Sequence, residues 1–225
     1  MKFDVNKLKK EQLRLAKKII VKDSFEDIKL VGGCDQAFID NKIISMVVVF
    51  DMDGKIIEKK HAVIDASIPF IPGFLAYREM PAILEAFNKL ENKPDILMCD
   101  CNGILHPRKI GMASHVGLIL EIPTIGIAKR KLIGIVDGNN KIMHEDQVLG
   151  MEVETKEHAK PVFVSPGHMV SMKTSVKFVK DWLKGHKTPE PLHVAHKFAN
   201  GVKKKLKEER ETENIETIDK QETKS

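Results

Sequence analysis

The sequence contains no apolar run that approaches the roughly 20 residues of a membrane-spanning helix, although 42% of its 225 residues are hydrophobic. Residues 1–11 are charged and lack the apolar stretch of a secretory signal. The hydrophobic content suffices for the core of one globular domain. We therefore expect a cytoplasmic protein without a membrane partner.

Cysteine is also scarce, and none of Cys34, Cys99 and Cys101 has the C-x-x-C spacing of a zinc site. Unpaired thiols of this kind are typical of a reducing compartment. Side chains alternate along a strand, so residues that flank Asp35 and Asp100 should point away from these two carboxylates. We expect packed thiols rather than metal ligands.

The net charge of +5 is small and unevenly placed. Residues 203–225 contain equal numbers of basic and acidic side chains, so the basic excess belongs to the preceding part of the chain. Such an excess is compatible with a nucleic-acid partner, although many basic domains bind none. We expect one domain over residues 1–207 and a charged, disordered tail over residues 208–225.

Hydrophobic periodicity and turn residues predict a defined order of helices and strands. Turn signals at residues 40–41 and 51–54 join the first three strands into an antiparallel meander. The expected elements are a helix at 4–21, strands at 29–38, 43–50 and 55–65, a helix at 74–91, a strand at 95–100, a helix at 109–121, strands at 124–128, 132–136 and 161–165, and helices at 171–183 and 190–209. This order indicates a ribonuclease H-like fold, which is an α/β fold with a mixed central sheet flanked by helices.

Two carboxylates follow apolar runs that the pattern predicts as strands. Asp35 follows residues 30–34, and Asp100 follows residues 96–99. The first and fourth strands of a ribonuclease H-like sheet are neighbours, so these two side chains should meet in one cleft. Oxygen ligands from separate elements suit Mg²⁺, with Mn²⁺ as a substitute. A metal site of this kind indicates phosphodiester hydrolysis.

Glu79 is the third acid of interest. It shares a helical stripe with Leu75, Ile83 and Phe87, which would turn its carboxylate toward the sheet. A buried carboxylate there needs a metal or a hydrogen-bond donor, whereas the alternative is a surface glutamate at the start of a helix. Pro81 interrupts the stripe and is compatible with a second helix that begins at residue 81.

Further short motifs lie between about residues 10 and 205. They are Gly33-Cys34-Asp35, Ile68-Pro69-Phe70-Ile71-Pro72-Gly73, Tyr77-Arg78-Glu79, Asp100-Cys101-Asn102-Gly103, His106-Pro107-Arg108, Ala113-Ser114-His115, Ile122-Pro123-Thr124-Ile125-Gly126-Ile127-Ala128-Lys129 and Ser165-Pro166-Gly167-His168. In this order they resemble the endonuclease V family. No single motif carries the resemblance, but the combination is highly specific.

The resemblance implies a DNA repair nuclease that recognises deaminated adenine, as hypoxanthine, and cuts the second phosphodiester bond on its 3′ side, leaving 3′-hydroxyl and 5′-phosphate ends. Asp35 and Asp100 match the family's metal-binding aspartates, and Glu79 matches its third active-site acid. His196 matches the catalytic histidine, and Lys129 matches a lysine near the scissile phosphate. The expected partner of this monomer is DNA containing deoxyinosine, and inosine RNA is the open alternative.

The segment Pro69-Phe70-Ile71-Pro72 matches the family's strand-separating wedge. Its prolines stiffen the loop, and its apolar side chains can enter a base step while the lesion rotates out. The alternative is a rigid loop over the core. The family usually has tyrosine at Phe70 and glycine at Cys101, so contacts with the lesion base can differ here.

Backbone groups near Gly73, Gly103 or Gly126 are candidates for reading the O6 and N1–H groups of hypoxanthine, because a fixed donor or acceptor rejects adenine, which presents the reverse pattern. His106, together with His115 and His168, is expected to order a loop or to contact a phosphate. The sequence does not indicate which glycine reads the base.

Two rival functions come from other classes. Residues 47–54 resemble the nucleophile motif of haloacid-dehalogenase-like phosphatases, in which Asp51 would attack phosphate and Asp53 would act as acid or base. Lys55 departs from that motif, and a hairpin turn explains residues 51–54 fully. The second rival is a nucleic-acid-binding module without catalysis, which is disfavoured because the acids repel phosphate unless metals bind.

Overall fold

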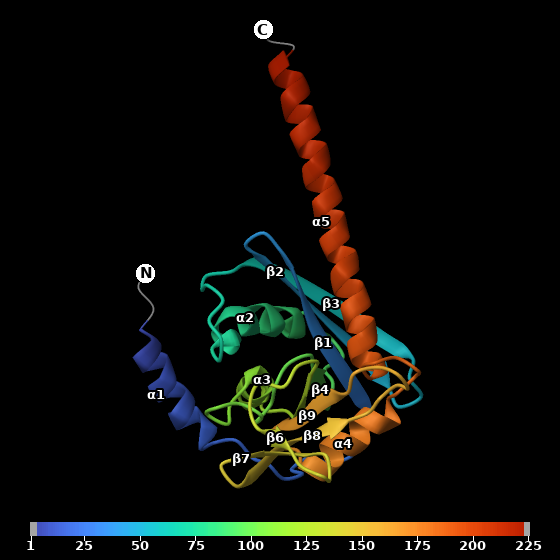
Figure 1. Cartoon of the computed structure of the whole chain (residues 1–225). Coiled ribbons are helices and arrows are strands. Elements are labelled where there is room, and N and C mark those ends of the chain that lie inside the picture. The colour runs from blue at the N-terminus through green and yellow to red at the C-terminus, as the bar shows by residue number, and fades with distance from the viewer. Residues whose placement is uncertain (1–3, 223–225) are drawn as a thin grey trace.

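The computed structural model describes residues 4–222, and their side chains as far as residue 212. The chain forms one α/β unit from which the last helix projects (Figure 1). The helices are α1 (Val5–Ala16), α2 (Leu75–Asn88), α3 (Met112–Leu120), α4 (Met172–Asp181) and α5 (Glu190–Glu222). The strands are β1 (Leu30–Ile39), β2 (Lys42–Asp51), β3 (Ile56–Asp65), β4 (Ile96–Cys99), β5 (Thr124–Ala128), β6 (Ile135–Val136), β7 (Lys141–His144), β8 (Gln147–Val153) and β9 (Val162–His168).

The described strands form one sheet of nine strands in the order β3-β2-β1-β4-β5-β9-β8-β7-β6. Strands β1 to β3 are antiparallel neighbours, β4 pairs parallel with β1, and β5 pairs parallel with β4. The strands beyond β5 pair antiparallel with their neighbours. The expected α/β fold with a mixed sheet is therefore confirmed, including the contact between the first and fourth strands.

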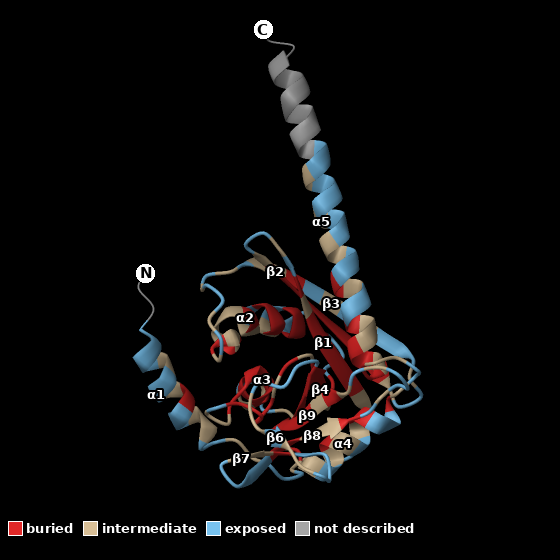
Figure 2. Ribbon diagram, viewed as in Figure 1, coloured by how far each residue is buried: buried red, intermediate tan, exposed pale blue. Residues whose placement is uncertain are grey.

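Helices cover both faces of the sheet, and the buried residues lie between the layers (Figure 2). On one face, α4 and α5 pack through a cluster that includes Trp182 and Leu192. On the other face, α2 and α3 pack through Ile83 and Val116. Because side chains alternate along each strand, β1 supplies residues to both clusters.

Gly33 fixes how closely α5 approaches the sheet. A Cβ atom at this position would lie 2.3 Å from the carbonyl carbon and oxygen of Pro191, near the start of α5. Only glycine leaves room for this contact between a helix backbone and the middle of a strand. The consequence is that the side chains of the following helical turns lie against β1.

The far edge of the sheet differs from the expectation. The strands expected at 132–136 and 161–165 correspond to β6 and β9, but β7 and β8 lie between them in both sequence and sheet. Residues 137–147 are mostly polar, and Asn140, Glu145 and Asp146 have positive φ angles in the turns that bound β7. Short edge strands with few apolar residues give a weak alternation signal, which is why the sequence missed them.

The helices also differ in length from the expectation. α1 ends at Ala16 rather than near residue 21, and α2 is continuous through Pro81, so no second helix begins there. α5 continues past the expected end near residue 209 to Glu222, and residues 223–225 of the expected tail lie outside the described residues.

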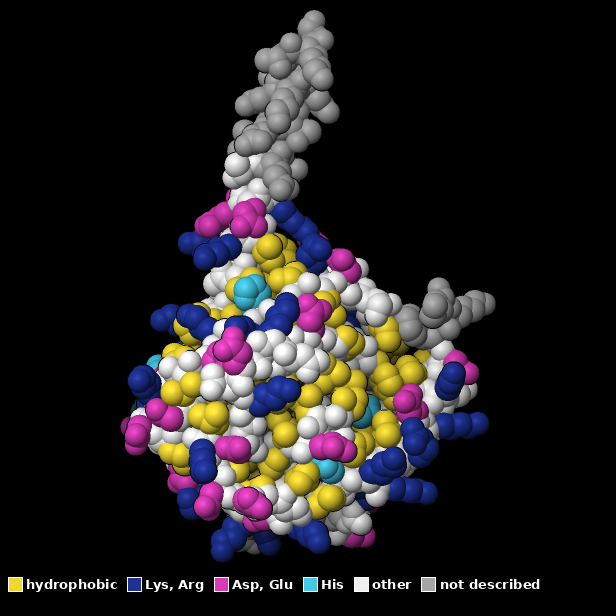
Figure 3. Space-filling view, turned by 180° about the vertical axis from the view of Figure 1, so that it is seen from behind, with side chains coloured by type: hydrophobic (Ala, Val, Ile, Leu, Met, Phe, Trp, Pro, Cys, Tyr) yellow, Lys and Arg dark blue, Asp and Glu magenta, His cyan; other side chains and the backbone are white. Residues whose placement is uncertain are grey.

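Figure 3 shows the molecule from behind, relative to Figure 1. On this face, basic and acidic side chains are both present, and hydrophobic side chains lie between them, so the charges form no single basic stripe. Among the described residues, no helix is long and apolar enough to cross a membrane.

Candidate active site

Asp35 and Asp100 lie side by side because their strands are parallel neighbours. Asp35 is in the middle of β1, and Asp100 follows the last residue of the shorter strand β4. Cys34 and Cys99 are register partners, and the Asp100 N–H donates to the Cys34 carbonyl at 3.2 Å. The sheet thus brings together two carboxylates that are distant in sequence, as the sequence predicted.

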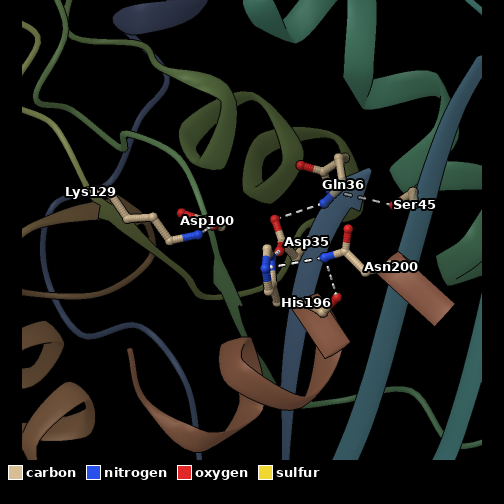
Figure 4. A network of polar contacts seen from close by, with 7 residues as sticks. All are labelled: Asp35, Gln36, Ser45, Asp100, Lys129, His196 and Asn200. Atoms are coloured by element: carbon tan, nitrogen blue, oxygen red, sulfur yellow. Dashed lines mark hydrogen bonds and ion pairs between the residues drawn. The ribbon is translucent and has the colours of Figure 1, made fainter. Parts of the chain in front are cut away.

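Each aspartate is paired with a basic side chain from another element. Asp35 Oδ2 lies 2.5 Å from Nδ1 of His196 on α5, and Asp35 Oδ1 accepts from the Gln36 N–H at 2.8 Å. Asp100 Oδ2 pairs with the Lys129 ammonium group, just beyond β5. Figure 4 shows the two pairs next to one another. Four of the sequence-predicted residues therefore share one site.

Asn200 orients the His196 ring, and the sequence did not single it out. The Asn200 side-chain N–H₂ group lies 3.1 Å from His196 Nε2 and donates to the His196 carbonyl at 2.9 Å (Figure 4). A donor at Nε2 makes this nitrogen the acceptor, so the ring proton is on Nδ1 and faces Asp35. The spacing of i and i+4 on one helix was the signal that could have indicated this pair.

Glu79 completes the acidic group from the opposite face of the sheet. It is 5% exposed and lies on the inward stripe of α2, which confirms the predicted stripe over the surface alternative. Burial first, and then the charges of Asp35 and Asp100, raise the pKa of Glu79 to about 7 against the opposing charge of Arg78. Burial and the charge of Asp35 raise the pKa of Asp100 to about 6, although Lys129 opposes this.

The donor set fits a hard divalent cation. Asp35 and Asp100 offer only oxygen atoms, and the raised carboxyl pKa values show that the site favours positive charge. Among the described residues, no group of three or more His, Cys, Asp and Glu side chains is arranged to hold one ion. Two carboxylates with remaining positions for water and phosphate are the way in which proteins commonly bind Mg²⁺.

An apolar cavity of about 150 Å³ lies next to this acidic site. Asn102, two residues beyond Asp100, forms part of its wall together with Gly73 and the start of α3 at Gly111 and Met112. The remaining lining residues are Gln12, Phe70, Ile71, Pro72, Leu75, Ala76, His106, Ile110 and Leu132. The cavity therefore includes residues of the wedge segment, and Asn102 connects its wall along the chain to Asp100.

Gly73 has a positive φ angle of 78°, and three side chains hold its carbonyl oxygen. The donors are Arg108 Nη2 at 2.7 Å, His106 Nε2 at 3.0 Å and Gln12 Nε2 at 3.1 Å. Burial lowers the pKa of His106 to about 4, so its ring is neutral and carries the proton on Nε2. His106 thus orders the loop, as predicted, and Gln12 on α1 is a partner that no sequence pattern indicated.

The wedge side chains extend into solvent. Phe70 is 66% exposed, and Pro69 and Pro72 are exposed as well. The loop is held from below, where the Arg78 guanidinium donates to the Ile68 carbonyl. An apolar tip on an anchored loop does not match a cap over the core, which was the alternative for this segment.

Gly103 and Gly126 lie behind the cavity wall rather than in it. A Cβ at Gly126 would lie 2.2 Å from Gly103 N, and a Cβ at Gly103 would lie 2.0 Å from the Pro166 carbonyl oxygen. These glycines allow backbones to pack closely, whereas Gly73 and Gly111 line the cavity. Cys101 is 6% exposed and packs in the cluster of α2 and α3, so its thiol does not line the cavity.

The other singled-out side chains lie apart from the carboxylates or in the core. His168 Nδ1 accepts from the Ile20 N–H at 3.3 Å, which ties β9 to the segment after α1. His115 is 1% exposed, packs edge-on against Tyr77, and has no hydrogen-bond partner among the described residues at either ring nitrogen. The three cysteines are buried and unpaired, as expected for packed thiols.

A sequence model of the family named Endonuclease V matches residues 13–197 of this chain. The match covers all five acidic, lysine and histidine residues of the site described above. This chain belongs to the endonuclease V family. The phosphatase alternative is set aside, because Asp51 Oδ1 accepts from the N–H groups of Asp53 and Lys55 in the β2–β3 turn, as the hairpin interpretation predicted.

Known endonuclease V proteins align with nearly the whole chain. Endonuclease V of Dictyoglomus turgidum is 38% identical over 198 residues, which are 84% of this chain and 87% of that protein. The crystal structure of endonuclease V from Streptomyces avermitilis has a TM-score of 0.85 and 27% identity, covering 92% of this chain and 96% of that one. Endonuclease V of Ciona intestinalis, solved with a 24mer DNA containing an inosine followed by a ribo-adenosine, has a TM-score of 0.80 and 28% identity, covering 90% and 98%.

Proposed function

We propose that this endonuclease V binds deoxyinosine in DNA and hydrolyses the second phosphodiester bond 3′ to the lesion, leaving 3′-hydroxyl and 5′-phosphate ends. One observation carries the proposal: the wall of a base-sized apolar cavity includes Asn102, two residues beyond Asp100, but contains neither carboxylate of the pair. A base rotated into this cavity leaves a neighbouring phosphate, rather than its own glycosidic bond, at Asp35 and Asp100.

The cavity supports recognition of hypoxanthine by a few polar groups in an apolar wall. At the start of α3 the N–H groups of Gly111 and Ala113 already donate to the carbonyls of Gly103 and Asn102, which leaves the N–H of Met112, a residue of the cavity wall, as the candidate donor. A donor directed at O6 accepts hypoxanthine and leaves the amino group of adenine unpaired. Asn102 adds an amide group to the same wall.

The active-site residues divide the hydrolysis between them. Asp35 and Asp100 would hold Mg²⁺, whose chemistry in such sites is water activation and charge neutralisation on phosphate. Lys129, whose side chain is 42% exposed, can turn from Asp100 toward a nonbridging phosphate oxygen. His196 keeps a proton on Nδ1 and directs Nε2 outward, where it can take or return a proton once substrate displaces Asn200.

The decisive experiment uses end-labelled duplexes that differ in one inosine or adenosine. With Mg²⁺ or Mn²⁺, the protein should give one nick, one nucleotide beyond the inosine on its 3′ side, and none in the adenosine duplex. Asp35→Asn should abolish the nick while inosine binding stays measurable, because the amide keeps the shape and loses the affinity for a cation. The same assay on inosine RNA tests the alternative partner.

Cleavage of the adenosine duplex at the same rate as the inosine duplex would show that the protein does not recognise the lesion. A nick that persists in Asp35→Asn would show that cleavage does not depend on a metal ion bound by Asp35. Inosine-selective binding without a nick under either metal would support a binding module instead.

A further inference from the structure

A second cavity, with a volume of about 470 Å³, opens on another side of the active site. Lys129 and His196 form the wall that it shares with the carboxylate pair. Two loops close the rest, residues 154–160 and residues 182–189. The Thr155 hydroxyl donates to the Lys187 carbonyl and ties these loops together. Neither loop contains one of the motifs that resemble endonuclease V.

Lysine and histidine side chains predominate in the wall of this cavity. Beyond Lys129 and His196, it contains Lys156, His158, His186, Lys187 and His193. The acidic residue in the described wall is Glu157, whose carboxylate lies 3.3 Å from His158 at the exposed rim. The rings of His186 and His193 stack with centroids 3.5 Å apart and planes at 8°, and His186 Nε2 lies 3.8 Å from Glu190 Oε2. Donors of this type match a phosphate group.

The two cavities have different lining residues, and each is connected to the aspartate pair through different residues. The base cavity is reached from Asp100 through Asn102, whereas the second cavity is reached through Lys129 and His196, which pair with Asp100 and Asp35. A strand with its flipped base in the first cavity and its scissile phosphate at the aspartates therefore continues into the second. Its charge is complementary to that of the cavity.

We propose that Lys156 and Lys187, with the stacked histidines, bind the phosphate that follows the scissile one on its 3′ side. This rests on the proposed function, because it assigns the position of the downstream strand. The site would hold the strand that leaves with the new 5′-phosphate, and so would contribute to substrate affinity.

The test combines a protein change with a substrate change. An inosine duplex carries a neutral methylphosphonate in place of the first phosphate 3′ to the scissile bond, and the variant is Lys156→Gln with Lys187→Gln. Each change alone should lower kcat/KM about tenfold, as for a lost charge-assisted hydrogen bond. Together they should lower it no further, because both remove the same contact.

A matched control is Lys160→Gln with Lys184→Gln, which removes two exposed lysines of the same loops that do not line the cavity. For this control variant, kcat/KM should fall on the methylphosphonate duplex by the same factor as for the wild-type protein. Equal kcat/KM of the wild-type protein on both duplexes would overturn the proposal, and so would losses that multiply in the combined case. The wild-type comparison stands even if the double variant does not fold.

Binding of both duplexes, measured with Ca²⁺ instead of Mg²⁺, repeats the comparison without cleavage. Absence of nicking by the wild-type protein with Mg²⁺ would count against the proposed function. Equal affinity for the two duplexes would count against this phosphate site.

Discussion

The His196 imidazole has a different partner at each ring nitrogen, and this determines what it can do in the reaction. Asp35 lies at Nδ1 and the Asn200 amide N–H₂ group lies at Nε2, an arrangement that favours the tautomer with its proton on Nδ1, and the His196 side chain is 54% exposed. Hydrogen bonds that fix the orientation and tautomer of an active-site histidine commonly matter as much as its own position. Asn200 is therefore a positioning residue.

Asn200→Ala should lower the single-turnover cleavage rate of an inosine duplex by roughly tenfold, the lower end of the usual effect of an outer hydrogen-bond partner. Binding of the duplex should change little, because Asn200 does not line either cavity. Asn200→Asp should lower the rate further, since a carboxylate at Nε2 and Asp35 at Nδ1 together favour the imidazolium, which cannot accept a proton. An unchanged rate in Asn200→Ala would show that the tautomer does not limit cleavage.

His115 makes folding sensitive to acid. Burial lowers its pKa from 6.5 to about 4. As the pH falls below 6.5, the unfolded chain takes up a proton at His115 and the folded chain does not until about pH 4, so the free energy of unfolding decreases over this window. The loss from this group should reach about 2 kcal/mol at pH 5.

Denaturant unfolding at pH 7.5 and pH 5 measures this effect. His115→Phe should keep the packing against Tyr77 and reduce the loss of stability between the two pH values. The pKa of His106 is also lowered by burial, so His106 should cause the loss of stability that remains in the variant. An identical pH dependence in the variant and the wild-type protein would contradict the assignment.

At the scale of elements, the wedge loop depends on a helix far from it in sequence. Gln12 of α1, His106 and Arg108 converge on the Gly73 carbonyl, and Arg78 of α2 holds Ile68 at the other end of the loop. The loop is thus fixed at both ends, while Phe70 between them is exposed. This arrangement suits a side chain that must enter a duplex without bending away.

Phe70→Ala should weaken binding to duplex inosine DNA by about 1–3 kcal/mol, the usual range for a lost stacking contact. The loss should be smaller on single-stranded inosine DNA, where no helix has to be opened. Phe70→Tyr should retain binding, because the stacking surface remains. Fluorescence anisotropy with both substrates measures the difference, and equal losses would argue against strand separation.

At the scale of the whole molecule, one long helix serves both the site and the exterior. The first turns of α5 pack against the sheet and carry His196 and Asn200, whereas residues 207–209 are exposed. Arg210 pairs with Asp40 across the surface, and both side chains are largely accessible. Exposed pairs of this kind contribute about 0–1 kcal/mol.

Truncation after Lys207 should therefore leave nicking unchanged and lower the free energy of unfolding by no more than about 1 kcal/mol. Leu206, which packs against the core, is retained in this variant. A control truncation after Ala195 should abolish activity, because it removes His196. A large fall in the melting temperature of the variant that ends at Lys207 would show that the removed residues are part of the folded domain.

Several features of the protein were determined by the sequence itself. Alternating apolar runs gave the first three strands and β5 nearly to the residue, and the stripe of Leu75, Glu79, Ile83 and Phe87 placed a carboxylate on the sheet face. The order of elements was enough to place Asp35 beside Asp100. These signals lie within windows of a few residues, or in the order of elements, so they can be read without coordinates.

The tertiary structure alone decided which distant groups share a space. Whether the Cys101 thiol points into the base cavity or the core, whether Gly103 or Gly111 lines the wall, and which side chains reach the Gly73 carbonyl depend on how loops cross in three dimensions. The second cavity could not be predicted from the sequence either, because its lysines come from separate loops that share no sequence pattern. Local periodicity encodes the elements, but close packing between elements selects the neighbours of each side chain.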